Sequence, residues 1–209
     1  MQAPQAVRLQ AVTVIAAGRA SEIVDIGDGR VLRRFKQGGR PEREAEVMKH
    51  ARAHGFPVPE VLEVLDDALV LERIDGPTML ADLRRLPWRT VPHARTLAEL
   101  HARLHEIPFE GERLLHLDLH PNNILLSARG AVVIDWTNAR AGDPSLDVAL
   151  TWVIGVTSAG LAGRALTWLF LRHVDREAAN SALPNAVALR LADPNVTDAE
   201  RTRVRRLLR

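Results

Sequence analysis

The chain has 209 residues, of which 46% are hydrophobic and 26% are charged. These values are typical of a globular protein and exclude intrinsic disorder over most of the chain. Because the sequence contains no cysteine, it excludes disulfides, thiolate zinc sites, iron–sulfur clusters and a cysteine nucleophile. The length suits one domain with two small lobes.

Charge and hydropathy limit the possible partners. The formal net charge of +2 is too small to indicate nucleic-acid binding. The longest uncharged segment, residues 148–163, has 16 residues and is interrupted by Thr, Ser and Gly, whereas a membrane-spanning helix needs about 20 apolar residues. We therefore expect a cytoplasmic protein without a membrane segment. The sequence carries no signal for the oligomeric state.

Short β-strands are predicted in the first third of the chain. The β-forming residues between 12 and 36 are interrupted by a Gly-Asp-Gly turn at 27–29, which indicates a hairpin. Pro41 then stands at a first helical position and is followed by acidic residues, so a helix is predicted to begin there. Two further short strands are predicted at 61–64 and 68–72.

An Asp-Gly-Pro breaker at 75–77 separates this part from a mainly helical one. Beyond it, leucines recur at helical spacing around residue 100, and helical sequence resumes from Pro144. We therefore predict an N-lobe at 1–74, built from a small antiparallel sheet and one helix. A mostly helical C-lobe is predicted at 75–209.

Polar and apolar residues alternate strictly in the segment His116-Leu117-Asp118-Leu119-His120. In an extended chain, this alternation places the two histidines and Asp118 on one side and both leucines on the other.

A second hairpin is predicted directly after this segment, with strands at 123–126 and 131–135. Pairing these strands in register brings Asn123 back beside Asp135. Together with Asp118, they form an all-oxygen site of the kind that Mg²⁺ prefers. The alternative is that Asn123 caps a turn and Asp135 is a solvated strand end, which explains either residue alone better than it explains all three.

Glu44 is predicted to lie on the inward face of the helix that begins at Pro41, because apolar residues follow it at offsets of three, four and seven. A carboxylate on an inward face needs a cation, and the preceding strand offers Arg33, Arg34 and Lys36. Kinases hold a cation over nucleotide phosphates with such a pair. The alternative is an exposed helix glutamate.

These segments resemble a known family. His-Leu-Asp-Leu-His-Pro-Asn-Asn at 116–123, Val-Val-Ile-Asp-Trp at 132–136 and Gly-Asp-Pro-Ser-Leu-Asp at 142–147 are similar to the catalytic core of the aminoglycoside phosphotransferases, which are relatives of choline kinases and protein kinases. Two segments between 31 and 48 resemble the first lobe of the same family. The resemblance covers about residues 18–150.

The resemblance implies a two-lobe, protein-kinase-like α+β fold. It also implies that the protein transfers the γ-phosphate of ATP to a hydroxyl group of a small substrate, with Mg²⁺. Asp118 would then be the catalytic base, and Asn123 and Asp135 would bind the magnesium ion. His116 and Asp147 would have structural roles.

The resemblance further implies how the nucleotide binds. The base would bond to the carbonyl group of Glu72 and the amide of Ile74, and a turn from Gly18 to Ser21 would cover the phosphates. Because backbone groups would contact the base, the sequence leaves the choice between ATP and GTP open.

The family usually has Lys or Arg at the position of Arg33, which would join Glu44 to the phosphates. We prefer Arg33 to Lys36 because Arg33 shares a strand face with Val31, whereas Lys36 points to the other side of a regular strand. Lys36 is the fallback if the strand carries a bulge.

Two other classes of protein would account for some of these residues. A metal hydrolase would use His116, Asp118 and His120, with His101 and His105 at i, i+4 spacing. That helix lacks the glutamate of zinc proteases, and a hydrolase would leave the predicted magnesium ligands and Glu44 unexplained.

The other alternative is a non-catalytic nucleotide-binding or interaction protein on a kinase-like scaffold. The loss of Asp118, Asn123 or Asp135 would have indicated such a protein, but all three residues are present.

The acceptor is predicted from the charges near the expected mouth of the site. Only Glu106, Glu110 and Glu112 are available there, and Arg113 and Arg140 lie close in sequence. We therefore expect a small hydroxylated compound in preference to a polycationic aminoglycoside.

Overall fold

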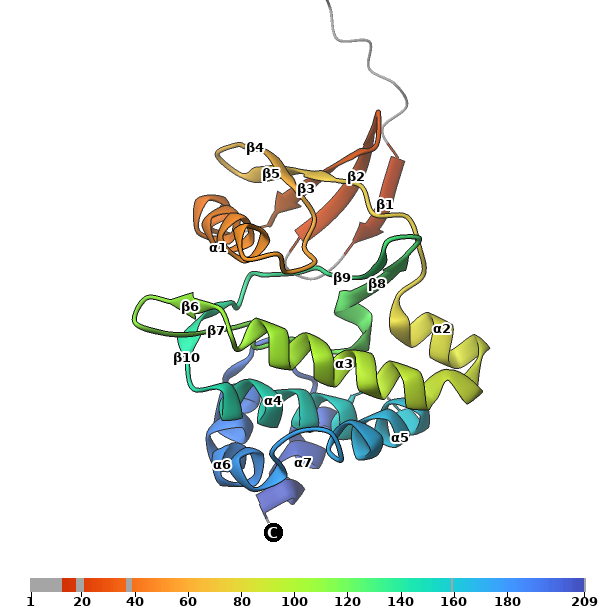
Figure 1. The fold of residues 1–209 in the computed structure, drawn as a ribbon, viewed down its shortest axis with the longest axis vertical. Helices are drawn as coiled ribbons and strands as arrows, with labels where there is room; N and C mark the ends of the chain where they lie inside the picture. The colour runs from red at the N-terminus through yellow and green to blue at the C-terminus, as the bar shows by residue number, and fades with distance from the viewer. Residues whose placement is uncertain (1–12, 18–20, 37–38, 159, 209) are drawn as a thin grey trace, which may run out of the picture.

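The computed structural model describes residues 13–17, 21–36, 39–158 and 160–208. A sheet with one helix comes first in the chain, and a larger, mainly helical part follows it (Figure 1). This arrangement confirms the predicted α+β architecture. The boundary between residues 74 and 75 stays a prediction.

Five antiparallel strands form the sheet of the first lobe, in the order β1-β2-β3-β5-β4. They are β1 (Thr13–Ala17), β2 (Ser21–Gly27), β3 (Arg30–Phe35), β4 (Val61–Val64) and β5 (Ala68–Glu72). Asp28 and Gly29 both have positive φ, 51° and 68°, and form the turn of the predicted β2–β3 hairpin.

The helix α1 (Pro41–Ala53) packs against this sheet (Figure 1). Pro41 begins it, because the fixed φ of proline suits the first helical turn. Gly55, with a φ of 74°, follows its C-terminal end. Glu44 is buried on the inner face of α1 together with Val47 and Met48, as predicted.

The second lobe contains six helices among the described residues. They are α2 (Met79–Arg85), α3 (Thr90–Leu104), α4 (Pro144–Thr157), α5 (Gly160–Phe170), α6 (Arg176–Ala192) and α7 (Asp198–Arg205). Short 3-10 turns lie at Pro87–Arg89, Pro121–Asn123 and Arg206–Leu208.

Five short strands lie between α3 and α4. They are β6 (Pro108–Phe109), β7 (Glu112–Leu115), β8 (Ile124–Ser127), β9 (Gly130–Val133) and β10 (Arg140–Gly142). The β8–β9 hairpin pairs Ile124 with Val133, which is the predicted register. The N–H of Ile134 donates to the carbonyl group of Asn123 at 3.0 Å, so the chain beyond β9 returns to Asn123.

The prediction of an extended segment at 116–120 is wrong. Strand β7 ends at Leu115, and Leu117 has a φ of 61°, a left-handed backbone that interrupts the alternation of side chains. His116 is consequently buried together with both leucines, while Asp118 and His120 are half-buried. The segment is a loop whose two outward side chains are Asp118 and His120.

One hydrophobic cluster runs through both lobes. It includes Met48 and Leu69 from the first lobe and Leu104, Val133 and Trp136 from the second. The N–H of Val133 also donates to the carbonyl group of Pro57 at 2.8 Å. A second cluster joins α4, α6 and α7 around the fully buried side chain of Val204. The two lobes therefore share a core as well as a chain connection.

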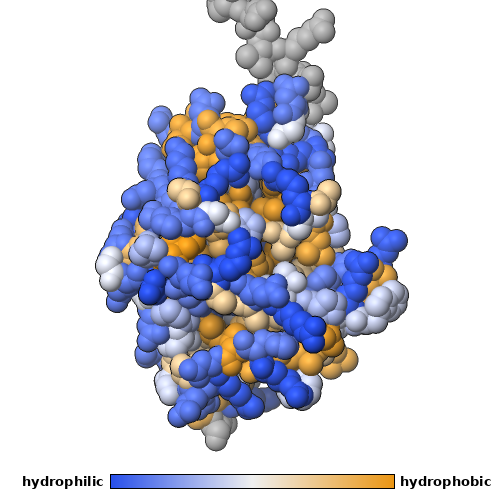
Figure 2. Space-filling model, in the orientation of Figure 1, coloured by the Kyte–Doolittle hydropathy of each residue, from blue (hydrophilic) through white to orange (hydrophobic). Residues whose placement is uncertain are grey.

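Hydrophobic residues on the face drawn in Figure 2 lie in separate patches among hydrophilic ones. Within the described residues, none of the helices has the length and hydropathy needed to cross a membrane.

Gly76 provides a test of how the lobes are connected. It has a φ of 149°, and a Cβ atom there would overlap the carbonyl group of Leu126 in β8. We expect Gly76→Ala to lower the free energy of unfolding by about 2 kcal/mol or more. Gly29→Ala is the matched control, because Gly29 also has positive φ but has open space around it, so its loss should be about 1 kcal/mol. Urea unfolding measures both, and equal losses would contradict the close packing of Gly76 on β8.

Candidate active site

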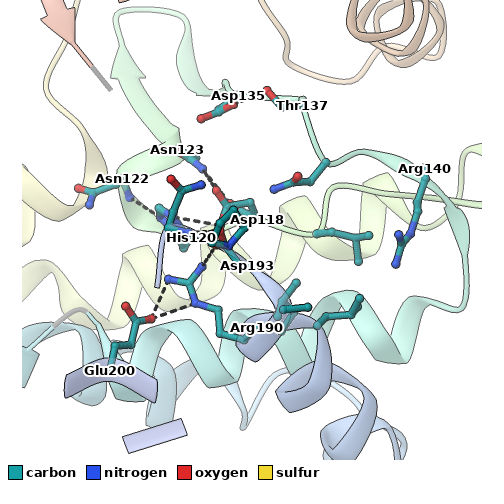
Figure 3. Close-up of a pocket in the computed structure, with 17 residues that line it drawn as sticks. Asp118, His120, Asn122, Asn123, Asp135, Thr137, Arg140, Arg190, Asp193 and Glu200 are labelled. Carbon is teal, nitrogen blue, oxygen red and sulfur yellow. Dashed lines mark hydrogen bonds and ion pairs between the residues drawn. The ribbon is translucent and has the colours of Figure 1, made fainter. Parts of the chain in front are cut away.

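A cavity of about 840 Å³ opens beside the loop that precedes β8 (Figure 3). The loop residues at 117–123 line one side, and residues 135–140 after β9 line another. The opposite wall comes from residues 189–195, at the end of α6 and beyond it, together with Glu200 of α7. The cavity thus brings the predicted catalytic and metal-binding residues together with a wall from the C-terminal helices.

Both carboxylate oxygens of Asp118 have a side-chain partner in this cavity. The side-chain amide of Asn123 donates to the carbonyl oxygen of Asp118 at 2.9 Å and to its Oδ2 at 3.0 Å. His120 Nε2 lies 3.4 Å from Oδ1, and His120 Nδ1 accepts from the N–H of Asn122 at 3.2 Å. Because Nδ1 is an acceptor, the neutral ring carries its proton on Nε2, facing Asp118.

Asp147, in the first turn of α4, contacts the buried side of the loop around Asp118 and holds that loop in place. Its carboxylate accepts the N–H groups of His116 and Leu117 at 3.0 and 2.8 Å and also accepts from His105 Nε2 at 3.1 Å. Burial alone would raise the pKa of Asp147, but these hydrogen bonds and the nearby His101 ring hold it well below its usual range. The charged carboxylate therefore stabilises the left-handed backbone at Leu117.

Thr151, one helical turn after Asp147, holds the other side of the loop. Its hydroxyl donates to the carbonyl group of Leu119 at 2.7 Å, and His101 Nε2 lies 3.1 Å from the same hydroxyl. Since the hydroxyl has one proton and gives it to Leu119, His101 must donate through Nε2–H. Asp147 and Thr151 of α4 therefore fix the backbone on either side of Asp118.

A second cluster surrounds Asp135, directly after β9. Arg33 Nη2 donates to Asp135 Oδ1 at 2.6 Å and to the Thr137 hydroxyl at 2.8 Å, while Arg33 Nε lies 3.3 Å from Glu44 Oε1. The Thr137 hydroxyl also lies 3.1 Å from Glu44 Oε2, and the N–H of Trp136 donates to Glu44 Oε1 at 3.3 Å. The predicted Arg33–Glu44 pair is thus joined to the second lobe at Asp135.

The two carboxylates of this cluster are in different electrostatic situations. Burial raises the pKa of Glu44, and Arg33 only partly opposes that effect. Burial also acts to raise the pKa of Asp135, but the charge and hydrogen bond of Arg33 outweigh it, so its pKa is lowered. Asp135 is therefore the more firmly ionised of the two.

Arg33 lies on the inward face of β3, as the strand alternation predicts. Only 5% of Arg33 is exposed, whereas Lys36 comes after the last residue of β3 and is exposed. β3 pairs with β5 without a bulge between Arg30 and Arg34, so the condition for the Lys36 fallback is not met.

The other predicted nucleotide-binding residues lie in the first lobe. Ser21 is buried at the start of β2, and Glu72 ends β5, with Ile74 two residues later. The Glu72 side chain pairs with Arg129 of the β8–β9 turn at 2.7 Å. Of the predicted phosphate-covering turn, residues 18–20 lie outside the described part of the chain.

Residues that can hold a divalent cation meet at one edge of the cavity. The Asn123 amide nitrogen is the atom that bonds to Asp118, so its amide oxygen remains for a metal ion. Asp135 keeps 39% of its side chain exposed beside it. Carboxylate and amide oxygens fit Mg²⁺, so the donor set agrees with the predicted metal.

The structure does not place the histidines of the alternative hydrolase around one cavity. His101 and His105 have ligand atoms near Asp147, but these three residues lie under the loop and do not line the cavity. His116 is fully buried, and its Nε2 lies 3.1 Å from the carbonyl oxygen of Ile134. These three histidines therefore support the loop, whereas His120 lines the cavity beside Asp118.

Several residues of the site were missed by sequence reasoning. The cavity is lined by Asp193 and Glu200, not by the glutamates at 106, 110 and 112 that were expected at its mouth. Glu110 instead pairs with Arg43 at 2.6 Å. The Thr137 hydroxyl was also missed, although its position two residues after Asp135 could have suggested it.

His101, beneath the loop, makes the unfolding free energy of the protein depend on pH. Burial lowers the pKa of His101 to about 3, against an attraction from Asp147. The folded state then keeps the ring neutral while the unfolded chain binds a proton below about pH 6.5, so stability falls on acidification. Between pH 6.5 and 4, we expect the unfolding free energy to lose up to about 1.4 kcal/mol per pH unit from this residue.

His101→Gln should flatten this dependence, because an amide keeps a donor for Thr151 but does not titrate. His173→Gln, at an exposed histidine, is the control and should leave the slope unchanged. Urea unfolding at several pH values measures the slope. An unaltered slope in His101→Gln would remove His101 as its source.

Comparison with known proteins gives local similarity in sequence. Thiamine kinase from Escherichia coli is 40% identical over 65 residues, which is 31% of this chain and 23% of that relative. A probable bifunctional tRNA threonylcarbamoyladenosine biosynthesis protein from Methanoculleus marisnigri is 31% identical over 131 residues, or 56% of this chain and 23% of that protein. The matches therefore span about a quarter of the length of these curated relatives.

Similarity in structure covers nearly the whole chain. The crystal structure of aminoglycoside phosphotransferase APH(4)-Ia has a TM-score of 0.73 at 18% identity and covers 94% of this chain and 92% of that one. A choline/ethanolamine kinase family protein from Mesorhizobium loti has a TM-score of 0.65 at 16% identity, covering 95% and 88%. These neighbours confirm the protein-kinase-like fold.

The phosphotransferase enzyme family (APH) matches this sequence over residues 11–114 and 80–179. These matches include the loop at 116–123, the β8–β9 hairpin, and Asp147. Because these matches cover most of the sequence, the chain belongs to the phosphotransferase enzyme family.

Proposed function

We propose that this protein transfers the γ-phosphate of ATP or GTP to a hydroxyl group of a small molecule, with Mg²⁺ as the cofactor and the cytoplasm as its location. The observation that supports this best is the meeting of Asp118, Asn123 and Asp135 at one cavity. Membership of a phosphotransferase family and the similarity to a thiamine kinase agree with it.

Asp118 is the proposed catalytic base. The acceptor hydroxyl would approach Asp118 from the cavity, and the carboxylate would orient it and accept its proton as the bond to phosphorus forms. Asn123 and His120 fix both carboxylate oxygens, so the base is oriented before the acceptor arrives. Such positioning is the main contribution that a protein makes to phosphoryl transfer.

Asn123 and Asp135 would hold the magnesium ion, which neutralises charge on the nucleotide phosphates when bound. Arg33 would keep its contact with Glu44 and direct its remaining N–H donors toward the phosphates. Glu72 and Ile74 would contact the base through backbone groups, and Ser21 would lie near the phosphate-covering turn.

Asp118→Asn tests the proposed base. We expect it to fold and bind nucleotide like the parent protein but to lower turnover by about 10²–10⁴-fold, because only the proton acceptor is lost. Asp135→Ala should instead lose magnesium-dependent nucleotide binding in calorimetry. Asp28→Asn, at the exposed β2–β3 turn, is the control. Turnover above a tenth of the parent value in Asp118→Asn would count against the role of Asp118.

The pair Arg33→Ala and Lys36→Ala tests which cation serves the nucleotide. Arg33→Ala should weaken nucleotide binding and slow transfer more than Lys36→Ala, because Arg33 alone of the two is buried beside Glu44 and Asp135. Nucleotide titrations and initial rates measure both variants. A greater loss in Lys36→Ala would assign the phosphate contact to Lys36.

A further inference from the structure

The wall of the cavity opposite Asp118 carries two carboxylates that are already paired. Arg190 binds Asp193 at 3.1 Å and Glu200 at 2.7 Å, and Glu200 also accepts from the hydroxyl of Ser158. Figure 3 shows Arg190 joined to these partners. A cationic acceptor needs free carboxylates, and this wall offers none that lacks a cation of its own.

Arg140 of β10 lines the same cavity in a different situation. It is exposed, and within the described part of the chain its guanidinium has no hydrogen-bond or ion-pair partner. Figure 3 shows it at one side of the cavity, without the dashed lines that join Arg190 to its partners. Arg140 therefore presents an uncompensated positive charge to whatever enters beside Asp118.

A second cavity of about 430 Å³ continues from the first one toward the start of α1. The two cavities share Thr137, Asn138 and Arg140. Arg40 lines the second cavity, and its guanidinium too has no partner among the residues that the structure describes.

The other charged residues of the second cavity are already paired. Arg43 binds Glu46 and Glu110, and Glu44 binds Arg33. The uncompensated charge where the two cavities meet is therefore positive.

We propose that the acceptor carries an anionic group, a carboxylate or a phosphate, which binds Arg140 while the acceptor hydroxyl lies at Asp118. The forked donors of arginine suit both anions, and Arg40 would add charge from the far wall of the second cavity. This inference rests on the proposed phosphotransfer and names the class of its acceptor.

The chemical step balances without a further reactant. The acceptor hydroxyl oxygen bonds to the γ-phosphorus, the bond from that phosphorus to the oxygen bridging the β- and γ-phosphates breaks, and the nucleoside diphosphate leaves. The hydroxyl proton passes to Asp118 and then to solvent. Arg140 acts on the acceptor alone and is a specificity residue.

The test uses the full chain loaded with Mg²⁺ and the ATP analogue AMP-PNP, so that the nucleotide site is filled. Calorimetry then compares four small probes: glycerol, glycerate, glycerol 3-phosphate and choline. We expect one or both anionic probes to bind at least tenfold more tightly than glycerol and choline. Glycerate against glycerol 3-phosphate distinguishes a carboxylate from a phosphate.

Arg140→Gln should weaken binding of the preferred anion by about tenfold or more and leave the affinity for ATP unchanged. Arg40→Gln should have a smaller effect, because Arg40 lines only the second cavity. Arg84→Gln is the matched control, since Arg84 is an exposed arginine of α2 that lines neither cavity.

Three results would overturn the inference. The first is equal or tighter binding of glycerol or choline than of both anions. The second is an unchanged anion affinity in Arg140→Gln. The third is a loss of ATP affinity in that variant, which would make Arg140 a nucleotide ligand. Absence of magnesium-dependent ATP binding in the parent protein would instead overturn the proposed phosphotransfer, and the inference with it.

Discussion

The position of the proposed catalytic base depends on one buried carboxylate. Asp147 accepts two successive backbone N–H groups of the loop, at His116 and Leu117, and so holds a non-glycine residue in a left-handed conformation. Such a backbone persists only where its surroundings determine it. The turn at Leu117 buries His116 and directs Asp118 into the cavity, so the proposed catalytic base is placed by a carboxylate that does not itself line the cavity.

The first lobe reaches the same site through Arg33. Its guanidinium lies between Glu44 of α1 and Asp135 of the second lobe, and the Thr137 hydroxyl contacts all three side chains. An ammonium group at this position would have fewer donors and no fork, so it could not match all of these acceptors with the same geometry. The arginine therefore suits a cluster in which one cation serves two carboxylates.

Much of the fold could be predicted because local signals agreed with it. Pro41 marked the start of α1, and the alternation around Arg33 gave its inward face. The β8–β9 register followed from a short turn between two apolar strands, and it placed Asn123 correctly. The loop at 116–120 could not be predicted in this way, because its shape is set by hydrogen bonds that its backbone N–H groups donate to Asp147, 31 residues from His116 in sequence. The cavity wall at residues 189–195 and Glu200 was missed because α6 and α7 approach the loop only through tertiary packing.

The hydrogen bond from Val133 to Pro57 has a consequence for how the molecule unfolds. Together with the cluster that contains Met48, Leu69 and Trp136, it ties the β8–β9 hairpin to the first lobe. Separating the lobes would expose apolar side chains on both, at a cost of about 25 cal/mol for each Å² of apolar surface. The two lobes should therefore lose their structure in a single cooperative transition, and an isolated first lobe would lack part of its own core.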